Sequence, residues 1–331
     1  MGIRMKREEF FERLFQGLEK ISQEERSRIQ EYYMELLLDK MEEGQPEEQV
    51  IEGFGRPEEI AQRIRGEQEG FRSSGSQLPA VNSAQGEQEG IYTPRGEIDS
   101  FEVRAQDTQL RLYPSRDGRF RVRYHPHENE IVTVREENGC FIFRHEIPLF
   151  ARIFSFWKIG RGPISVEVPG EMIRRFHAAT SNSAVTVEGL CDFDEGSIMS
   201  SNAKVSVRNV TGGSLECRTS NSSMVLEDCE VRQLTAETSN GGISCGRCTG
   251  EKLGLKTSNA RIEANRLEYA DIRLKTSNGG LRGTIRGDIR EYVIDSGTSN
   301  GSSNLPSWGD NRCTRRLYAH TSNASIKIEF V

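Results

Sequence analysis

Hydrophobic and polar residues alternate through the C-terminal half of the chain in a pattern with a period of about 19 residues, which is typical of a stacked array of small units. Each repeat carries Thr-Ser-Asn or, once, Ser-Ser-Asn. The asparagines of these repeats are Asn182, Asn202, Asn221, Asn240, Asn259, Asn278, Asn300 and Asn323. The spacing is nearly constant over the first six asparagines and becomes longer on both sides of Asn300.

Within each repeat, apolar residues lie six and four positions before the asparagine, and three, five and eight positions after it. Around Asn259 these positions hold Leu253, Leu255, Ile262, Ala264 and Leu267. Alternation with period 2 predicts strands with one buried face, and three strands with three bends leave no room for a helix. Each repeat is therefore predicted to be one coil of an all-β parallel β-helix, or solenoid, with coils stacked roughly 4.8 Å apart.

The repeated asparagine is interpreted as a structural residue of a corner between strands. Asn tolerates the left-handed backbone conformation, and its amide can donate and accept, so stacked copies can form a hydrogen-bonded ladder. The parity of the alternation predicts that Thr and Asn point inward and Ser outward. An alternative is a repetitive binding surface for ice or a glycan, but inward side chains favour the ladder.

Residues 1–65 predict a small all-α helical bundle. Apolar residues recur at helical spacing from Met5 to Lys20 and again from about Glu24 to Glu43, and two shorter helices follow from Pro46 and Pro57. Ser22 followed by Glu25 is a capping box. The apolar faces are wide for so short a segment, which predicts completion by a partner or a second copy.

Residues 66–90 are rich in Ser, Gly, Gln and Glu and predict a flexible linker. Charge is uneven: residues 1–65 carry 11 basic and 16 acidic residues, residues 66–90 carry 1 and 4, and the remainder 32 and 30. Without a concentrated basic footprint, nucleic acid is not an expected partner. There is no apolar h-region near Met1 and no run of 18 apolar residues, so we expect a cytoplasmic protein.

The motifs Met5-Lys-Arg-Glu-Glu-Phe10, Tyr32-Tyr33 and Gly55-Arg-Pro-Glu-Glu-Ile-Ala61 resemble the HAAS signalling domain of Firmicute bacteria. This resemblance implies a helical interaction module, commonly encoded beside PadR-type transcriptional regulators and often followed by membrane spans. It therefore implies a protein partner, either a PadR-type regulator system or a second copy of the chain. It carries over no catalytic residue.

The solenoid is predicted to span residues 91–331, with Asp107 as the equivalent of the asparagine in an irregular first coil. In that coil Phe120 and Val122 are predicted to form the third strand. The strand Ile164-Ser-Val-Glu-Val-Pro169 before the T-S-N-G and T-S-N-A repeats resembles a bacterial β-solenoid family labelled as adhesins and otherwise of unknown function. The resemblance implies a right-handed parallel β-helix, a non-enzymatic role and an association with cell-envelope stress responses.

One aromatic and basic segment, residues 147–161, interrupts the repeats. Its conspicuous side chains are Phe150, Arg152, Phe154, Phe156, Trp157 and Lys158. One interpretation is a cap over the open apolar end of the solenoid. Another is peripheral contact with the inner face of a membrane, through aromatic rings at the headgroups and cations near anionic lipid. A third is a docking patch for a protein.

The remaining candidate chemistry is sparse. Cys245 and Cys248 spell C-x-x-C, but both fall on apolar columns of the repeat, so they are interpreted as buried hydrophobic residues rather than as a redox pair or half of a zinc site. No cluster of carboxylates or histidines recurs on one face, and we expect no cofactor, no metal and no enzymatic activity.

Two functions remain open. The first is a scaffold or adaptor in bacterial signalling or cell-envelope stress response, with the helical bundle contacting a protein and the solenoid presenting a rigid surface. The second is an adhesin-like module that binds a polymer or a glycan at the cell surface.

Overall fold

The computed structural model describes residues 5–18, 21–42, 45–73, 89–125, 130–148, 162–170, 173–307 and 313–331. The chain divides into two compact units. The first is an N-terminal helical unit, and the second is a β unit that contains the strands. Within the described residues, no helix combines the length and the apolar character needed to cross a bilayer.

The helical unit contains four helices: α1 (Arg7–Gln16), α2 (Gln23–Glu42), α3 (Glu47–Phe54) and α4 (Pro57–Ser73). The capping box predicted before α2 is present. The backbone N–H of Ser22 donates to Glu25 Oε2 at 2.7 Å, and the N–H of Glu25 donates to Ser22 Oγ at 3.2 Å. The apolar core includes Phe10, Leu14 and Ile64, which are 0–1% exposed.

Helix α4 continues to Ser73, so the predicted linker boundary after residue 65 was wrong. The sequence Gly66-Glu-Gln-Glu-Gly70 has the polar composition of a linker, but it contains no proline. Glu and Gln are good helix formers, so a helix that is already nucleated can continue through them.

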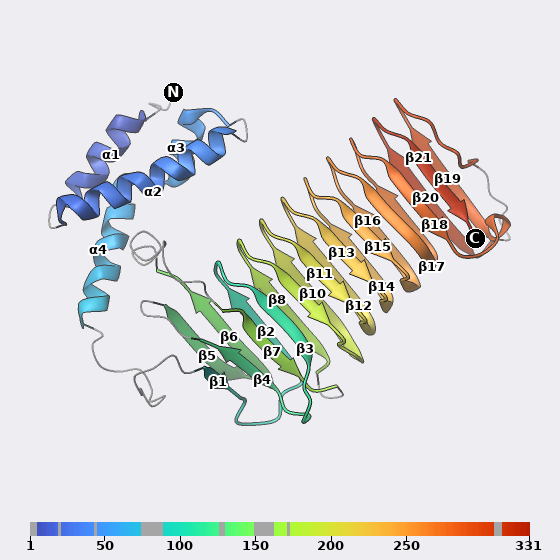
Figure 1. Cartoon of the computed structure of the whole chain (residues 1–331), viewed down its shortest axis with the longest axis horizontal. Coiled ribbons are helices and arrows are strands. Elements are labelled where there is room, and N and C mark those ends of the chain that lie inside the picture. Colours follow the sequence, from blue (N-terminus) through green and yellow to red (C-terminus); the bar gives the residue numbers. More distant parts are fainter. Residues whose placement is uncertain are drawn as a thin grey trace. The chain divides into compact units, whose positions relative to one another are not determined.

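The β unit consists of short strands that pair from coil to coil (Figure 1). We call its two main layers sheet A and sheet B. Sheet B contains, in spatial order, β6 (Cys140–Glu146), β2 (Ser100–Ala105), β8 (Arg175–Thr180), β10 (Phe193–Ser200), β12 (Thr211–Thr219), β14 (Glu230–Glu237), β16 (Thr249–Lys256), β17 (Ile262–Lys275), β20 (Arg315–Thr321) and β19 (Tyr292–Thr298). Neighbouring strands of sheet B are parallel.

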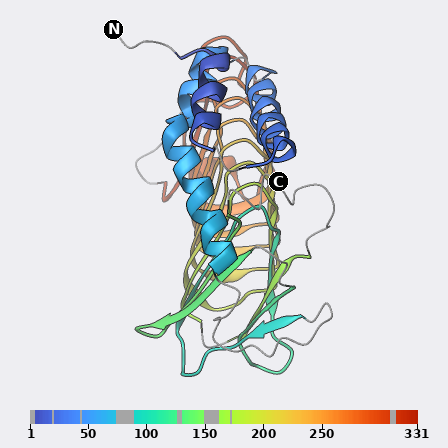
Figure 2. The same ribbon diagram turned by 90° about the vertical axis from the view of Figure 1, so that its left-hand side faces the viewer.

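Sheet A contains β1 (Gly90–Tyr92), β4 (Arg121–Tyr124), β7 (Ile164–Val168), β3 (Leu110–Pro114), β9 (Val185–Glu188), β11 (Val205–Arg208), β13 (Met224–Glu227), β15 (Ile243–Gly246), the first half of β17, β18 (Leu281–Ile285) and β21 (Ile326–Phe330). The strand β5 (Ile131–Glu137) and the short 3-10 helix η1 (Ile289–Glu291) complete the named elements. Seen end-on, the coils lie one behind another (Figure 2).

In the central coils the register advances by one sequence repeat per coil, as in the pairs Met224↔Ile243 and Ile243↔Ile262. The apolar positions of the repeat fill the interior, and Leu253, Leu255 and Leu267 are 0–2% exposed. The β unit is thus a solenoid of stacked parallel coils with the interior that the alternation predicts. Its right-handed sense remains a prediction.

At both ends of the stack, spatial order departs from chain order. Strand β2 lies between β6 and β8, so the first coil of the sequence is the second coil in space. Likewise, β20 lies between β17 and β19. This arrangement accounts for the longer spacing on both sides of Asn300, because that asparagine belongs to the outermost coil.

The segment with Phe120 and Val122 is a strand with an apolar inner face, but its predicted place in a parallel coil was wrong. This strand, β4, pairs antiparallel with β7 and with β1, which closes sheet A at the N-terminal end. The alternation of buried residues is the same for parallel and antiparallel pairing, so the sequence pattern could not distinguish the two.

Candidate interaction surface

The outer face of sheet B is a regular surface that continues from coil to coil. Along each strand every second side chain is buried, and the residues between them point outward, as Glu216 and Arg218 do on β12. Register pairing brings outward side chains of successive coils into columns roughly 4.8 Å apart. The fold therefore displays polar side chains at fixed spacing on a stiff support.

A shallow depression of about 620 Å³ lies on this face over the N-terminal coils. It reaches from β6 and β2 across β8 to β12, and Glu137 at the end of β5 and Asn138 in the turn before β6 also line it. Polar side chains predominate among its lining residues, which include Glu102, His177 and Glu195. Burial, followed by the positive charge of Arg104, lowers the pKa of His177, so this imidazole is neutral at pH 7.

A second groove, of about 480 Å³, follows the corner beside the Thr-Ser-Asn repeats. It is lined on one side by the serines Ser220, Ser239 and Ser258, and on the other by charged residues such as Arg218 and Lys256. The groove therefore runs from coil to coil and offers one hydroxyl per coil. Both depressions are open, unlike the enclosed pockets that bind drug-sized molecules.

The repeated asparagines form a continuous ladder of amide hydrogen bonds. In the central coils, Asn259 Nδ2 donates to Asn240 Oδ1 and Asn278 Nδ2 donates to Asn259 Oδ1, both at 2.7 Å. The same bond links the other members: Asn202 to Asn182, Asn221 to Asn202, Asn240 to Asn221, Asn323 to Asn278 and Asn300 to Asn323. At the N-terminal end Asn182 donates to Asp107 Oδ1, which places Asp107 as the predicted equivalent of the asparagine.

The asparagine side chains are exposed, so the prediction that they point inward was wrong. Six of the seven threonines of the repeats are buried, and Thr298 in the outermost coil is partly exposed. Thr257, for example, is 2% exposed and donates to the carbonyl of Gly241 at 2.9 Å. Alternation ends at the corner, where the N–H groups of both Ser220 and Asn221 donate to the carbonyl of Ser201. The backbone turns there, and the asparagine is carried outward.

The left-handed conformation predicted for the asparagines occurs at a different corner. None of the eight asparagines is among the described residues with positive φ. Positive φ values of 51° to 54° occur seven residues later in successive coils, at Asn209, Asp228, Arg247 and Arg266. Arg is an unusual residue for this conformation, which explains why the sequence pattern did not reveal the corner.

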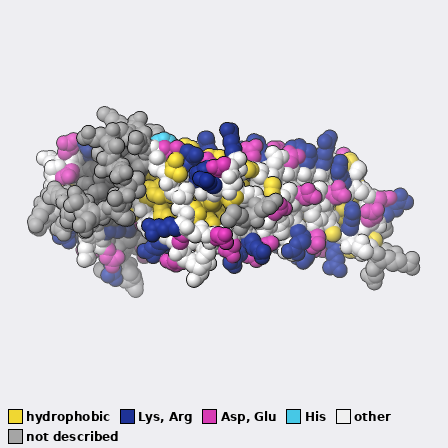
Figure 3. Space-filling view, turned by 90° about the horizontal axis from the view of Figure 1, so that it is seen from below, with side chains coloured by type: hydrophobic (Ala, Val, Ile, Leu, Met, Phe, Trp, Pro, Cys, Tyr) yellow, Lys and Arg dark blue, Asp and Glu magenta, His cyan; other side chains and the backbone are white. Residues whose placement is uncertain are grey.

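The aromatic and basic side chains predicted as a membrane or partner patch, Phe150, Arg152, Phe154, Phe156, Trp157 and Lys158, lie outside the described residues. Among the described residues, hydrophobic side chains gather over the N-terminal coils on one side of the β unit (Figure 3). Exposed apolar residues of the β unit include Ile91 on β1 and Val134 on β5, which are 52% and 37% exposed.

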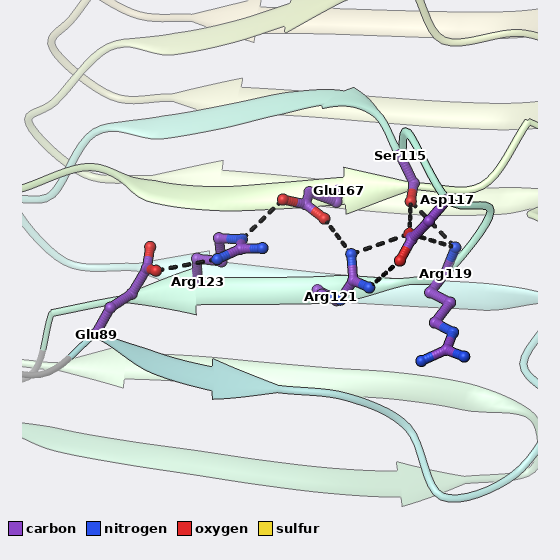
Figure 4. Close-up of polar contacts among 7 residues, drawn as sticks. All are labelled: Glu89, Ser115, Asp117, Arg119, Arg121, Arg123 and Glu167. Carbon is purple, nitrogen blue, oxygen red and sulfur yellow. Dashed lines mark hydrogen bonds and ion pairs between the residues drawn. The ribbon is translucent and has the colours of Figure 1, made fainter.

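Ion pairs join the antiparallel strand β4 to β7 on the outer face of sheet A (Figure 4). Glu167 accepts from Arg121 and from Arg123, both at 2.7 Å. Arg121 also binds Asp117, and Arg123 binds Glu89 at 3.0 Å. Burial by itself would raise the pKa of Glu167, but the hydrogen bonds from the two arginines outweigh it and hold that pKa below its usual value.

We expect Glu167→Gln to destabilise the β unit by about 1 kcal/mol at pH 7, because both arginines lose a charged acceptor. Since the folded state lowers the pKa of Glu167, its contribution is present above the usual Glu pKa and is lost as pH falls through the folded value. Urea unfolding of both proteins at several pH values measures this difference. Glu188→Gln on β9 is the control, because Glu188 is exposed in the same sheet; an equal loss there would contradict the prediction.

All seven cysteines are free thiols. Cys245 and Cys248 are fully buried, as their columns predict. Burial also raises the pKa of Cys217 to about 12, which keeps that thiol protonated. Among the described residues, no three His, Cys, Asp or Glu side chains converge in a way that could hold a metal ion.

Residues 98–330 match the family model named Toastrack DUF4097, which covers the β unit from before β2 to the end of β21. The chain belongs to the Toastrack DUF4097 family. Residues 9–63 match the HAAS model, so the N-terminal unit is a HAAS domain placed before a Toastrack domain. No curated protein matches the chain.

Two solved structures are similar to the chain over most of their own length. A candidate lipid-binding protein from Parabacteroides distasonis shares 11% identity with a TM-score of 0.41, covering 73% of this chain and 96% of that protein. A candidate cell adhesion protein from Clostridium sporogenes shares 9% identity with a TM-score of 0.23, covering 74% of this chain and 99% of that protein. Neither likeness is close enough to transfer a ligand to the Toastrack domain.

Sequence reasoning missed the depression over the N-terminal coils and the ion-pair network of the Toastrack domain. Asn138-Gly139 is a hairpin signal that could have placed Glu137 beside the sheet. The alternating Arg121 and Arg123 could have suggested a charged outer face on β4, but no spacing rule assigns their partner Glu167, which lies far from both in the sequence.

Proposed function

We propose that this protein is a non-enzymatic interaction scaffold in bacterial signalling or in the cell-envelope stress response. The HAAS domain contacts a protein, and the Toastrack domain presents a rigid surface to a second partner. The observation that carries this proposal is the outer face of sheet B, where polar side chains recur at fixed spacing and the depressions are open. Such a surface suits a macromolecular partner better than a small molecule.

Exposed apolar side chains support a protein partner for the HAAS domain. On α2, Leu38 is 54% exposed and Met41 is 39% exposed, and residues three apart lie on one side of a helix. Clusters of solvent-exposed large apolar side chains are common where one protein binds another. A PadR-type regulator is the first candidate partner and a second copy of the chain is the other, which fits a cytoplasmic site of action.

The test measures binding of the full-length protein to a purified PadR-type regulator, and its self-association by light scattering. We expect one of the two to occur and to be lost in the double variant Leu38→Glu, Met41→Glu. Gln30→Glu, an exposed change on the same helix, is the control and should leave binding intact. If the double variant still binds, and circular dichroism shows that the variant and the wild type are both folded, the proposed role of this helix is contradicted.

A second candidate function is that of an adhesin-like module for a surface polymer or a glycan. The groove along the Thr-Ser-Asn corner favours it, because an extended chain lying parallel to the stack would meet one serine hydroxyl in every coil. Finding the protein at the cell surface by fractionation would support this function over the scaffold.

A further inference from the structure

Three neighbouring strands near the C-terminal end of sheet B place nine outward positions in a grid. In register, the positions are Lys252, Gly254 and Lys256 on β16, Asp271, Arg273 and Lys275 on β17, and Arg316, Tyr318 and His320 on β20. Five of the nine are Lys or Arg and one is Asp. We call this grid the cationic patch; its strands are roughly 4.8 Å apart.

The cations of the patch are only partly neutralised. Arg273 pairs with Asp271 at 3.3 Å, and Lys256 lies 3.9 Å from Glu237 on β14. In the part of the chain that the structure describes, no acidic side chain pairs with Lys252, Lys275 or Arg316, and all three are exposed. The patch therefore holds three cations that are free to meet an anion.

Two aromatic rings lie beside these cations. The rings of Tyr318 and His320 stack with their centroids 4.2 Å apart, and His320 Nε2 lies 2.8 Å from Asp295 Oδ1 on β19. Gly254 carries no side chain, so a ligand can approach the backbone of the sheet between Lys252 and Lys256.

The charges around the patch indicate the shape of the ligand. Elsewhere on the same face, β10 displays Glu195 and β12 displays Glu216, which pairs with Arg218, while Glu237 on β14 borders the patch and pairs with Lys256. A flat anionic membrane would bring Glu195 and Glu216 against its own charge, whereas a narrow chain laid across Lys252, Lys275 and Arg316 leaves both carboxylates in water. Charge complementarity therefore favours a linear polyanion over a membrane.

We propose that the cationic patch binds a linear, non-nucleic polymer of phosphate groups. Single-stranded nucleic acid gains affinity from bases that stack on open aromatic rings, and here the two rings stack on each other. A phosphate polymer needs only the cations. This inference goes beyond the scaffold by naming a ligand class for the outer face, and it does not depend on the HAAS domain.

The test titrates full-length protein with inorganic polyphosphate at low and moderate salt. We expect the triple variant Lys252→Gln, Lys275→Gln, Arg316→Gln to bind at least about tenfold more weakly at low salt. The slope of log K against log salt should fall by about 2, the equivalent of three lost phosphate contacts. The matched control, Lys204→Gln, Lys327→Gln, Arg282→Gln, removes the same charges from exposed positions outside the patch and should bind almost as the wild type does.

Three results would overturn the inference. The first is no binding of polyphosphate by the wild type at low salt. The second is an equal loss of polyphosphate affinity in both triple variants, which would show that only the net charge of the protein matters. The third is tighter binding to single-stranded DNA of equal charge, or to vesicles containing anionic lipid, than to polyphosphate. Each can occur while the HAAS variants still lose their protein partner, so failure here is distinct from failure of the scaffold.

Discussion

Replacing Gly241 with Ala is expected to destabilise the Toastrack domain by about 2–3 kcal/mol. A Cβ at this position would lie 1.7 Å from the carbonyl oxygen of Ser222 and 2.2 Å from its carbon. Both are backbone atoms of the neighbouring coil, so no side-chain rotation can relieve the overlap. The corner must shift and strain the hydrogen bonds around it. Ala260 holds the equivalent place after Asn259, which indicates that a shifted corner can form and limits the cost.

Equilibrium unfolding in urea measures this loss, with β-sheet circular dichroism as the signal. Gly246→Ala is the matched control, because Gly246 belongs to the same coil and its Cβ would find its nearest atom, the carbonyl oxygen of Asn265, at 4.0 Å. We expect the control to stay within about 0.5 kcal/mol of the wild type. Equal stability of the two variants would show that neighbouring coils are not in the close contact described.

Asn259→Asp is expected to cost about 1–2 kcal/mol at neutral pH. The amide of Asn259 donates to Asn240 Oδ1 and accepts from Asn278, both at 2.7 Å. A carboxylate can still accept, but it cannot donate, and it places negative charge against the oxygen of Asn240. Because the ladder is exposed to water, the loss stays below that of a buried unsatisfied group.

The cost of Asn259→Asp should also depend on pH. The folded state favours the protonated acid, which can donate, so it raises the pKa of the new carboxyl above the unfolded value. The variant is therefore closest to the wild type below the usual Asp pKa and loses stability as pH rises through the folded value. Asn209→Asp is the control, because Asp228 already occupies the same corner in the next coil. A pH-independent deficit would contradict the role of the donated hydrogen bond.

Much of the Toastrack interior could be predicted because one physical rule, alternation with period 2, operates unchanged in every coil. Leu253 and Leu255 are inward in the sequence pattern and buried in the structure. The ladder could be predicted as well, because identical residues at a constant period must stack when the coils do. Even Asp107, which is not an asparagine, was assigned correctly from the apolar residues around it.

The features that could not be predicted are those that depend on direction rather than periodicity. Period 2 does not distinguish the antiparallel pairing of β4 from parallel stacking. It does not show where a corner turns Asn259 outward, because parity holds only within a strand. The cationic patch includes Lys252 and Arg316, which are far apart in sequence and lie on either side of Asp271 because β20 pairs with β17.

The position of β2 and β20 one coil inside each end of the stack has a consequence for how the domain is made. A solenoid assembled strictly in order of synthesis would add each coil to a finished edge. Strand β2 pairs with β6 on one side and with β8 on the other, and the ribosome synthesises both of these strands after β2. Strand β20 must enter between β17 and β19, which have both been synthesised before it. Folding can therefore follow the order of synthesis only through the middle coils. At the two ends it waits for contacts between residues that are farther apart in the sequence, and such contacts form more slowly.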